Sequence, residues 1–279
     1  MNSGTPLSIA ITPLADALGV AVTGVDLAQA VLPSDLKAMK QALRNHLVMV
    51  IRGQSLSPEQ YLVAIRLFGD TMPQHLTDWL MPEHPEIAVL DSRNIPASAD
   101  GIVKQPGSRD WHTDSTNFAK PPKITALYAI SLPSSGGDTG FANMHMAFDA
   151  LPGDEQENLG GMKTNNKVED REYVGADHKK TSQVHPLIRT HPETGKKAIY
   201  IHPGKAVNFV GMQAAESHVF MDKLMETVIQ PDICYRHKWQ VGDLLLCDNR
   251  SVMHLAYNDY DHAEGRVMHR ITLQGDVPV

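Results

Sequence analysis

The sequence predicts a mainly β protein with flanking helices, an α+β chain whose strands form a β-sandwich or jelly roll. Short segments either alternate apolar and polar residues or are apolar throughout, Gly- and Pro-rich turns separate them, and few segments have helical spacing. A chain of 279 residues with 42% hydrophobic residues is long enough to bury a sizeable core. We therefore expect one domain over 1–279.

The first part of the chain mixes strands and helices. Residues 8–12 and 20–26 alternate apolar and polar side chains, as half-buried strands do. Ser34 is the expected N-cap of a helix over 35–47, in which Leu and Met recur at helical spacing. The apolar run 47–51 suits a buried strand.

A second helix and a loop follow. Ser57 and Pro58 indicate a helix start, with proline at the first helical position, and the helix should end near Leu67. Residues 70–110 look irregular because they are rich in Pro, Asp, His and Ser. Such a stretch inside a compact domain is often a lid or binding loop, so we expect an active-site loop there.

The rest of the chain is predicted to be mostly β. Residues 155–184 are polar, and their pattern predicts no element. The expected strands are 123–130, 138–143, 235–240, 243–247 and 266–274, the expected hairpin joins 185–190 to 197–201, and the expected helices begin at 146 and 213.

Charge and composition exclude several functions. The net charge of −7 argues against a nucleic-acid partner, because phosphate binding needs a basic face. The absence of a long apolar run argues against a membrane span, and the N-terminus does not resemble a signal peptide. Cys234 and Cys247 form no disulfide framework, which fits two buried thiols in a cytoplasmic protein.

The motif Trp-His-Thr-Asp-Ser places His112 and Asp114 two residues apart. In an extended segment both side chains point to the same face. A second histidine would complete the two-His, one-carboxylate triad of non-haem Fe(II) oxygenases. By itself, His-x-Asp is weak evidence, since it also occurs as a surface or buried structural pair.

Several motifs together are far more specific. The motifs occur over nearly the whole chain, in the order ITPL, LGVAVTGVDL, VIRGQSLSPEQ, FGD, WHTDST, GGDT, HPLIRTHPETGKKAIYI, VGDLLLCDNRSVMH and RVMHRITL. Here the sequence resembles the taurine/2,4-D (TauD/TfdA) family of Fe(II)- and 2-oxoglutarate-dependent dioxygenases. The resemblance implies a double-stranded β-helix, Fe(II), 2-oxoglutarate and O₂ at the site, a small anionic substrate, and a homo-oligomer, either dimer or tetramer.

The resemblance also assigns residues. His112, Asp114 and His254 match the iron ligands, which would make them the catalytic centre. Arg266 matches the arginine that pairs with the far carboxylate of 2-oxoglutarate, and Thr139 matches its hydroxyl companion. A planar guanidinium beside a hydroxyl suits a carboxylate, which it can bond through two N–H groups.

Arg270 matches the arginine that holds the anionic head of the substrate in taurine-type members. Arg266 and Arg270 are evenly spaced on one expected strand, so we expect both to face the interior, with His269 on the opposite face. Taken singly, Thr139 could equally fill a strand, and either arginine could lie on the surface.

The sequence departs from the family pattern around the substrate. Gln74 stands where taurine oxidation uses a histidine, with His75 one residue later. Lys205 replaces a substrate-packing aromatic residue, and it is either exposed or an additional inward-facing cation. Arg109 and Ser115 are further candidate substrate contacts. Taurine itself is therefore doubtful, and the substrate could be a carboxylate, sulfonate, sulfate ester, phosphonate or aryloxyalkanoate.

Three functions are weighed on this basis. The favoured one is a dioxygenase that hydroxylates a small anionic molecule and releases succinate and CO₂. The first alternative is a non-catalytic jelly-roll protein that binds a metal or an anion, which would not need Arg266 and Thr139 beside a full triad. The second is a zinc hydrolase, disfavoured because the chain lacks a His-Glu-x-x-His helix.

Overall fold

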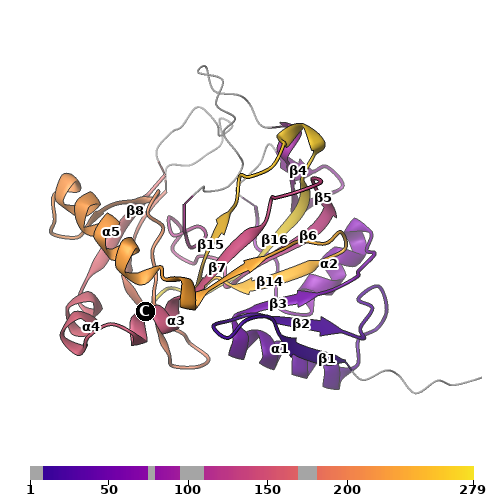
Figure 1. Cartoon of the computed structure of the whole chain (residues 1–279), viewed down its shortest axis with the longest axis horizontal. Coiled ribbons are helices and arrows are strands. Elements are labelled where there is room, and N and C mark those ends of the chain that lie inside the picture. The colour runs from indigo at the N-terminus through magenta and orange to yellow at the C-terminus, as the bar shows by residue number, and fades with distance from the viewer. Residues whose placement is uncertain (1–8, 75–78, 95–109, 169–180) are drawn as a thin grey trace, which may run out of the picture.

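A computed structural model of the chain describes residues 9–74, 79–94, 110–168 and 181–279, and strands dominate it (Figure 1). The strands are β1 Ala10–Pro13, β2 Val20–Thr23, β3 Val48–Ile51, β4 Leu80–Met81, β5 His84–Asp91, β6 Ile124–Ser131, β7 Thr139–Asn143, β8 Lys163–Lys167, β9 Ser182–Pro186, β10 Ile188–Thr190, β11 Lys197–Ile199, β12 Ala206–Phe209, β13 Cys234–His237, β14 Leu244–Asp248, β15 Val252–Ala256 and β16 Val267–Leu273. The α-helices are α1 Pro33–His46, α2 Pro58–Arg66, α3 Met144–Asp149, α4 Gly153–Gly160 and α5 Ala214–Val228.

Two β-sheets form the central part of the fold. The large sheet has eight strands in the order β1-β2-β3-β14-β6-β16-β5-β4, and a small sheet has the order β13-β7-β15. Figure 1 shows α1 and α2 beside the large sheet, while β7 and β15 lie on its other side, toward α3, α4 and α5. The mainly β expectation is confirmed, and the described strands form open sheets without a closed barrel.

The central strands are buried on both faces. In β3, Met49 and Ile51 pack with α1 and α2, whereas Val48 and Val50 pack toward the small sheet with Phe141. The same alternation occurs in β14, which pairs with β3. Consecutive apolar residues are therefore needed here, because side chains alternate between two cores.

The helix starts follow from local chemistry. The expected start of α2 at Ser57 and Pro58 is confirmed. There Ser57 and Gln60 form a capping box in which each side chain accepts the other residue's backbone N–H. At α1, the prediction that Ser34 is the N-cap is wrong. Leu32 is the N-cap and no side chain caps the helix, which begins with Pro33, a residue without an N–H to satisfy.

The expectation that 70–110 is irregular is wrong for β4 and β5. Residues 84–91 form a full strand because they pair antiparallel with β16, from Val267 opposite Asp91 to Arg270 opposite Ala88. That pairing is distant in sequence, so local composition does not reveal it. Residues 75–78 and 95–109 lie outside the described residues, and they include His75 and Arg109.

Some of the other elements match the sequence predictions and some do not. The hairpin of β10 and β11 and the helix α5 are confirmed. The sequence did not predict α4, β8, β12 or β15, and β15 carries His254. Among the described residues, no helix combines the length and apolar character that crossing a membrane requires.

Candidate metal centre

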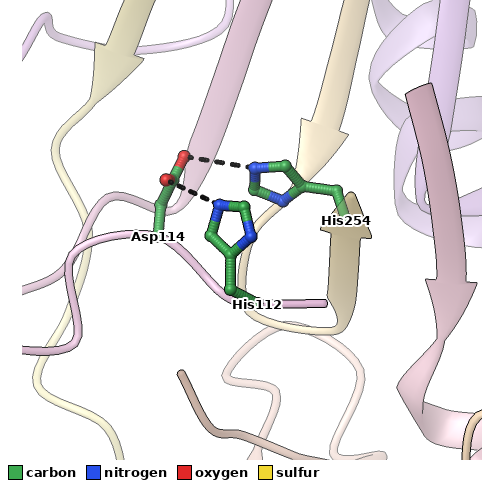
Figure 2. A group of neighbouring side chains, drawn as sticks. All are labelled: His112, Asp114 and His254. Atoms are coloured by element: carbon green, nitrogen blue, oxygen red, sulfur yellow. Dashed lines mark ion pairs between the residues drawn. The ribbon is translucent and has the colours of Figure 1, made fainter. Parts of the chain in front are cut away.

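His112, Asp114 and His254 converge on one point. Each offers one ligand atom, and these atoms all lie within 4.8 Å of one another. Figure 2 shows the carboxylate of Asp114 facing both imidazoles, with Nε2 of each histidine 3.8 Å from a carboxylate oxygen. Two imidazoles and one carboxylate around a common centre form the facial triad that binds non-haem Fe(II).

The backbone brings the two histidines together. His112 and His254 form an isolated antiparallel bridge in which each N–H donates to the other's carbonyl, at 3.0 and 2.9 Å. Their ring centroids are 4.2 Å apart. Residue 112 thus continues the small sheet beyond β15, although 142 residues separate it in sequence from residue 254.

The surroundings of both histidines keep their imidazole rings neutral. Burial, together with the neighbouring His254, lowers the pKa of His112 to about 3. Burial also lowers the pKa of His254. The Nδ1–H of His112 donates to the carbonyl of Asp110 at 2.8 Å, which leaves the Nε2 lone pair facing the centre.

Asp114 is ionised and firmly held. Burial alone would raise the pKa of its carboxyl group. Arg270, the two histidines and the Thr125 hydroxyl together lower it more, so the pKa lies well below its usual value. Its Oδ2 accepts hydrogen bonds from Thr125 at 2.7 Å and from Arg270 at 2.9 Å. Its Oδ1 accepts none from the residues that the structure describes, so it is available to a cation.

The donor set fits a ferrous ion. Two neutral nitrogens and one carboxylate oxygen are arranged around a point, and the carboxylate and one of the rings have outer hydrogen bonds that fix them. The unpaired Nδ1 of His254 is buried without a described partner. Three donors on one side would leave the remaining positions of an octahedral ion for other ligands.

Arg266 and Thr139 lie together, as expected. The Arg266 guanidinium donates from Nε to the carbonyl of Gly137 at 2.8 Å, and Nη2 is 3.5 Å from the Thr139 hydroxyl. Trp239 supplies an aromatic ring 5.9 Å from the guanidinium, and its indole N–H donates to Thr139 at 3.0 Å. No described carboxylate forms an ion pair with Arg266.

The turn before β7 has to contain glycine. Gly137 has a φ of +71°, and a Cβ there would lie 3.1 Å from the side chain of Arg266. A Cβ on Gly136 would collide with the backbone of Asp259. The GGDT motif therefore lets the backbone approach the arginine closely enough to hold it.

Arg270 occupies a second position beside the triad. Its Nη1 donates to Gln74 Oε1 at 3.3 Å, while Nη2 pairs with Asp114. Gln74 is itself fixed, because its Nε2 donates to the hydroxyl of Thr272 and the carbonyl of Glu86. Of the two candidates at this position, Gln74 contacts Arg270, and His75 lies outside the described residues.

The expectation that Arg266 and Arg270 lie on one strand is wrong. Arg266 precedes β16, and the register of β16 shifts between Val267 and Met268, so simple alternation does not carry over to Arg266. Alternation does hold beyond the shift. The His269 ring lies 6.4 Å from Tyr61 of α2, on the opposite face from Arg270.

Lys205 faces inward. It is half-buried, and its Nζ donates to Asn117 Oδ1 at 3.0 Å. Burial lowers the pKa of this ammonium to about 8, with Arg270 also lowering it and Asp114 raising it. Ser115 is buried in a left-handed conformation with φ 55°, and its carbonyl accepts the Phe118 N–H.

Sequence reasoning missed several residues around the centre. His202 is buried with its ring 4.9 Å from that of His112, and it was not singled out. Thr125 and Trp239 were also missed, because nothing local marks a threonine or tryptophan whose partner is distant in sequence. Asn249, from the turn after β14, bonds both polar backbone groups of Asp114.

Known proteins match the chain closely. The family model described as "Taurine catabolism dioxygenase TauD, TfdA family" matches residues 10–272. The alpha-ketoglutarate-dependent 2,4-dichlorophenoxyacetate dioxygenase of Cupriavidus pinatubonensis is 31% identical over 98% of this chain and 100% of its own. An alkylsulfatase of Acinetobacter baylyi is 32% identical over 93% of this chain and 83% of its own.

Solved structures agree with the sequence matches. A putative alpha-ketoglutarate-dependent taurine dioxygenase from Burkholderia xenovorans has a TM-score of 0.83 and 31% identity, over 98% of this chain and 94% of that one. AAD-2 in complex with Mn(II) and N-oxalylglycine has a TM-score of 0.81 and 25% identity, over 98% and 99%. The chain belongs to the TauD/TfdA family, whose members are dioxygenases that use Fe(II), 2-oxoglutarate and O₂.

Proposed function

We propose that this dioxygenase hydroxylates a small anionic organic molecule, in the class of sulfonates, sulfate esters, phosphonates, carboxylates and aryloxyalkanoates. The proposal depends on the buried triad and on two arginines. Arg270 pairs with Asp114 of the triad, whereas Arg266 donates to a backbone carbonyl. With Fe(II), 2-oxoglutarate and O₂ bound, such a centre would oxidise a substrate C–H bond. The same reaction would convert 2-oxoglutarate to succinate and CO₂.

Arg266 and Thr139 are assigned to 2-oxoglutarate. The guanidinium is close to a hydroxyl and an indole, with no carboxylate partner among the described residues. A partly buried cation without an anion is unfavourable, so a ligand carboxylate would satisfy Arg266. The far carboxylate of 2-oxoglutarate supplies such a group, and the fork of N–H donors suits its geometry.

Arg270 is assigned to the anionic head of the substrate. Asp114 and Gln74 each accept from one of its terminal nitrogens, which fixes the guanidinium beside the triad and leaves other N–H groups for a ligand. Relatives are named for 2,4-dichlorophenoxyacetate, sulfate esters, alkyl sulfates and (S)-phenoxypropionate. All of these carry an anionic head on a carbon skeleton, which supports the assignment.

Hydroxylation at the carbon that bears the heteroatom would have a further consequence. A carbon with both a hydroxyl and a sulfate, sulfonate or aryloxy group is unstable and collapses to a carbonyl compound. The expected products are then an aldehyde or keto acid together with sulfate, sulfite or a phenol. These products distinguish the substrate classes in one assay.

The alternatives have less support. A non-catalytic metal- or anion-binding jelly roll does not require Arg266 beside Thr139, and the named relatives are dioxygenases. A zinc hydrolase needs a general base beside the metal. In the described part of the chain, the carboxylate nearest the centre is the ligand Asp114 itself.

We further propose one domain over 1–279 that works in the cytoplasm as a homo-oligomer, either dimer or tetramer. Free Cys234 and Cys247 support a reducing compartment. The single-domain proposal is supported by the family match, which runs through almost the whole chain. Size-exclusion chromatography with light scattering tests the oligomer.

The decisive assay measures succinate formed from 2-oxoglutarate in the presence of Fe(II) and each member of a substrate panel. The panel contains alkyl sulfates, alkyl sulfonates, phosphonates and phenoxy acids. We expect at least one class to stimulate succinate formation, and we expect His112→Ala to abolish it. Full turnover by His112→Ala would contradict the proposal, as would a panel in which no anion stimulates succinate formation.

A further inference from the structure

Lys205 lies close to the residues assigned to metal and substrate, on a turn that begins at His202. The backbone N–H groups of Lys205 and Ala206 both donate to the carbonyl of His202, at 2.9 Å each, so the turn is tight. His202 lies against His112. This turn therefore brings an ammonium group close to the centre.

The positive charge of Lys205 acts on the other charged groups of the site. Its ammonium donates to Asn117 Oδ1 at 3.0 Å and interacts electrostatically with Asp114 and Arg270. With a pKa of about 8, the amine is mostly protonated at neutral pH. Lys205 and Arg270 are thus two positive charges near the same triad.

Only one of these two cations has a carboxylate partner. Arg270 pairs with Asp114 at 2.9 Å. Lys205 has a neutral partner, the amide oxygen of Asn117, and no described carboxylate lies within ion-pair distance of it. A neutral donor such as glutamine could make the same hydrogen bond, so the bond to Asn117 does not explain why a charge is present.

We propose that Lys205 is a second cationic contact for the substrate, and that the preferred substrate is a dianion whose two anionic groups bind Arg270 and Lys205. This inference rests on the proposed function, because it refines the substrate class at the same site. Lys205 is a specificity-determining residue in this scheme. A half-buried ammonium that lacks an anion is costly, and a second substrate carboxylate, sulfonate or phosphonate would relieve that cost.

His202 adds an independent observation. Its ring is buried, and its Nδ1 has no hydrogen-bond partner among the described residues. An unpaired buried polar group beside Lys205 is also more stable when a polar ligand or water is bound there.

The experiment compares matched pairs of ligands. Sulfoacetate, 3-sulfopropanoate and 4-sulfobutanoate are dianions, and ethanesulfonate, propane-1-sulfonate and butane-1-sulfonate replace the carboxylate with a methyl group. Binding to protein loaded with Fe(II) and 2-oxoglutarate is measured anaerobically by calorimetry, and succinate formation is measured in air. We expect at least one dianion to bind the wild type about tenfold or more tightly than its partner.

Lys205→Gln is the central variant because it keeps an N–H donor for Asn117 and removes the charge. We expect it to lose most of the dianion preference while its affinity for the monoanions changes little. Lys163→Gln, at an exposed position of β8, controls for net charge and should keep the preference. Asn117→Ala removes the partner but keeps the cation, and it should also keep the preference.

Three results would overturn the inference. The first is a wild type that binds no dianion, and the second is a wild type that binds both members of every pair with equal affinity. The third is a Lys205→Gln variant that loses affinity for both members of a pair to the same extent. These results differ from failure of the proposed function, in which no anion of the wider panel stimulates succinate formation. Calorimetry reads the dianion preference without turnover, so the two failures are distinguishable.

Discussion

Asn249 holds the backbone of Asp114 at both of its polar groups. Its Oδ1 accepts the Asp114 N–H at 2.8 Å, and its Nδ2 donates to the Asp114 carbonyl at 3.2 Å and to the Pro122 carbonyl at 2.8 Å. The carboxylate that faces the two imidazoles is therefore fixed by a side chain from the turn after β14. That turn leads directly into β15 and His254, so one short segment sets two of the three donors.

Replacing Asn249 should weaken metal binding without unfolding the protein. Asn249→Ala removes two hydrogen bonds to the Asp114 backbone and one to the Pro122 carbonyl. Loss of such outer contacts typically lowers metal affinity about 10- to 100-fold. Calorimetric titration of the metal-free protein with Mn(II) measures the change in metal affinity. Asn158→Ala, on the exposed face of α4, is the control. An Asn249→Ala protein with wild-type metal affinity would show that Asp114 does not depend on this clamp.

Arg266→Lys should raise the KM for 2-oxoglutarate about tenfold or more. A lysine keeps the positive charge but cannot offer the planar pair of N–H donors that a carboxylate accepts. The KM is measured by succinate formation at saturating substrate, with the exposed Arg66→Lys as the control. If the KM for 2-oxoglutarate stays the same while the KM for substrate rises, the assignments of the two arginines are reversed.

Gln74→Leu should act on substrate rather than on 2-oxoglutarate. Gln74 Oε1 accepts from Arg270, and a hydrogen bond to a charged group contributes roughly 1.5–3 kcal/mol. We expect the KM for substrate to rise about tenfold, with the KM for 2-oxoglutarate close to wild type. Gln29→Leu, at an exposed position, is the control. Equal changes in both constants would indicate general damage to the site instead.

Much of the fold could be predicted where the determining chemistry is local. The capping box of Ser57 and Gln60 lies within four residues, so the start of α2 was readable from sequence. By contrast, β5 exists because it pairs with β16, about 180 residues later, and its own Pro- and His-containing sequence looks irregular. Similarly, β15 was missed because its strand character comes from pairing with β7.

The site was predictable to the extent that it consists of motif residues. The triad was expected and its geometry is present, because the motif spacing specifies residue identity as well as order. Thr125 and His202 were not predicted, since their importance arises only when β6 and the turn after β11 approach Asp114 and His112. A threonine in a strand carries no local sign of a distant carboxylate.

Acid should destabilise the metal-free protein from about pH 6.5 downward. His145, His185 and His237 lie outside the metal centre, and burial is the main cause that lowers the pKa of each below the ordinary value of 6.5. The unfolded chain therefore binds protons that the folded chain does not, so the free energy of unfolding falls as the pH drops from 6.5 toward the folded pKa values.

Urea unfolding at pH 7.5 and 5.5, with a chelator present, measures this effect. We expect a lower free energy of unfolding at pH 5.5, and His185→Gln should show a smaller difference between the two pH values. The control is His218→Gln, at an exposed position of α5. Stability that rises on acidification would contradict the neutral, buried state of these rings.

The most direct test of the central claim is an anaerobic titration of the protein with Fe(II) and then with 2-oxoglutarate, followed by visible absorption. One equivalent of each should give a weak charge-transfer band, because the keto acid would chelate an ion held by His112, Asp114 and His254. His254→Ala, folded as judged by circular dichroism, should give no band. A folded wild-type protein without the band, or a His254→Ala protein with an undiminished one, would contradict the assignment of the metal centre.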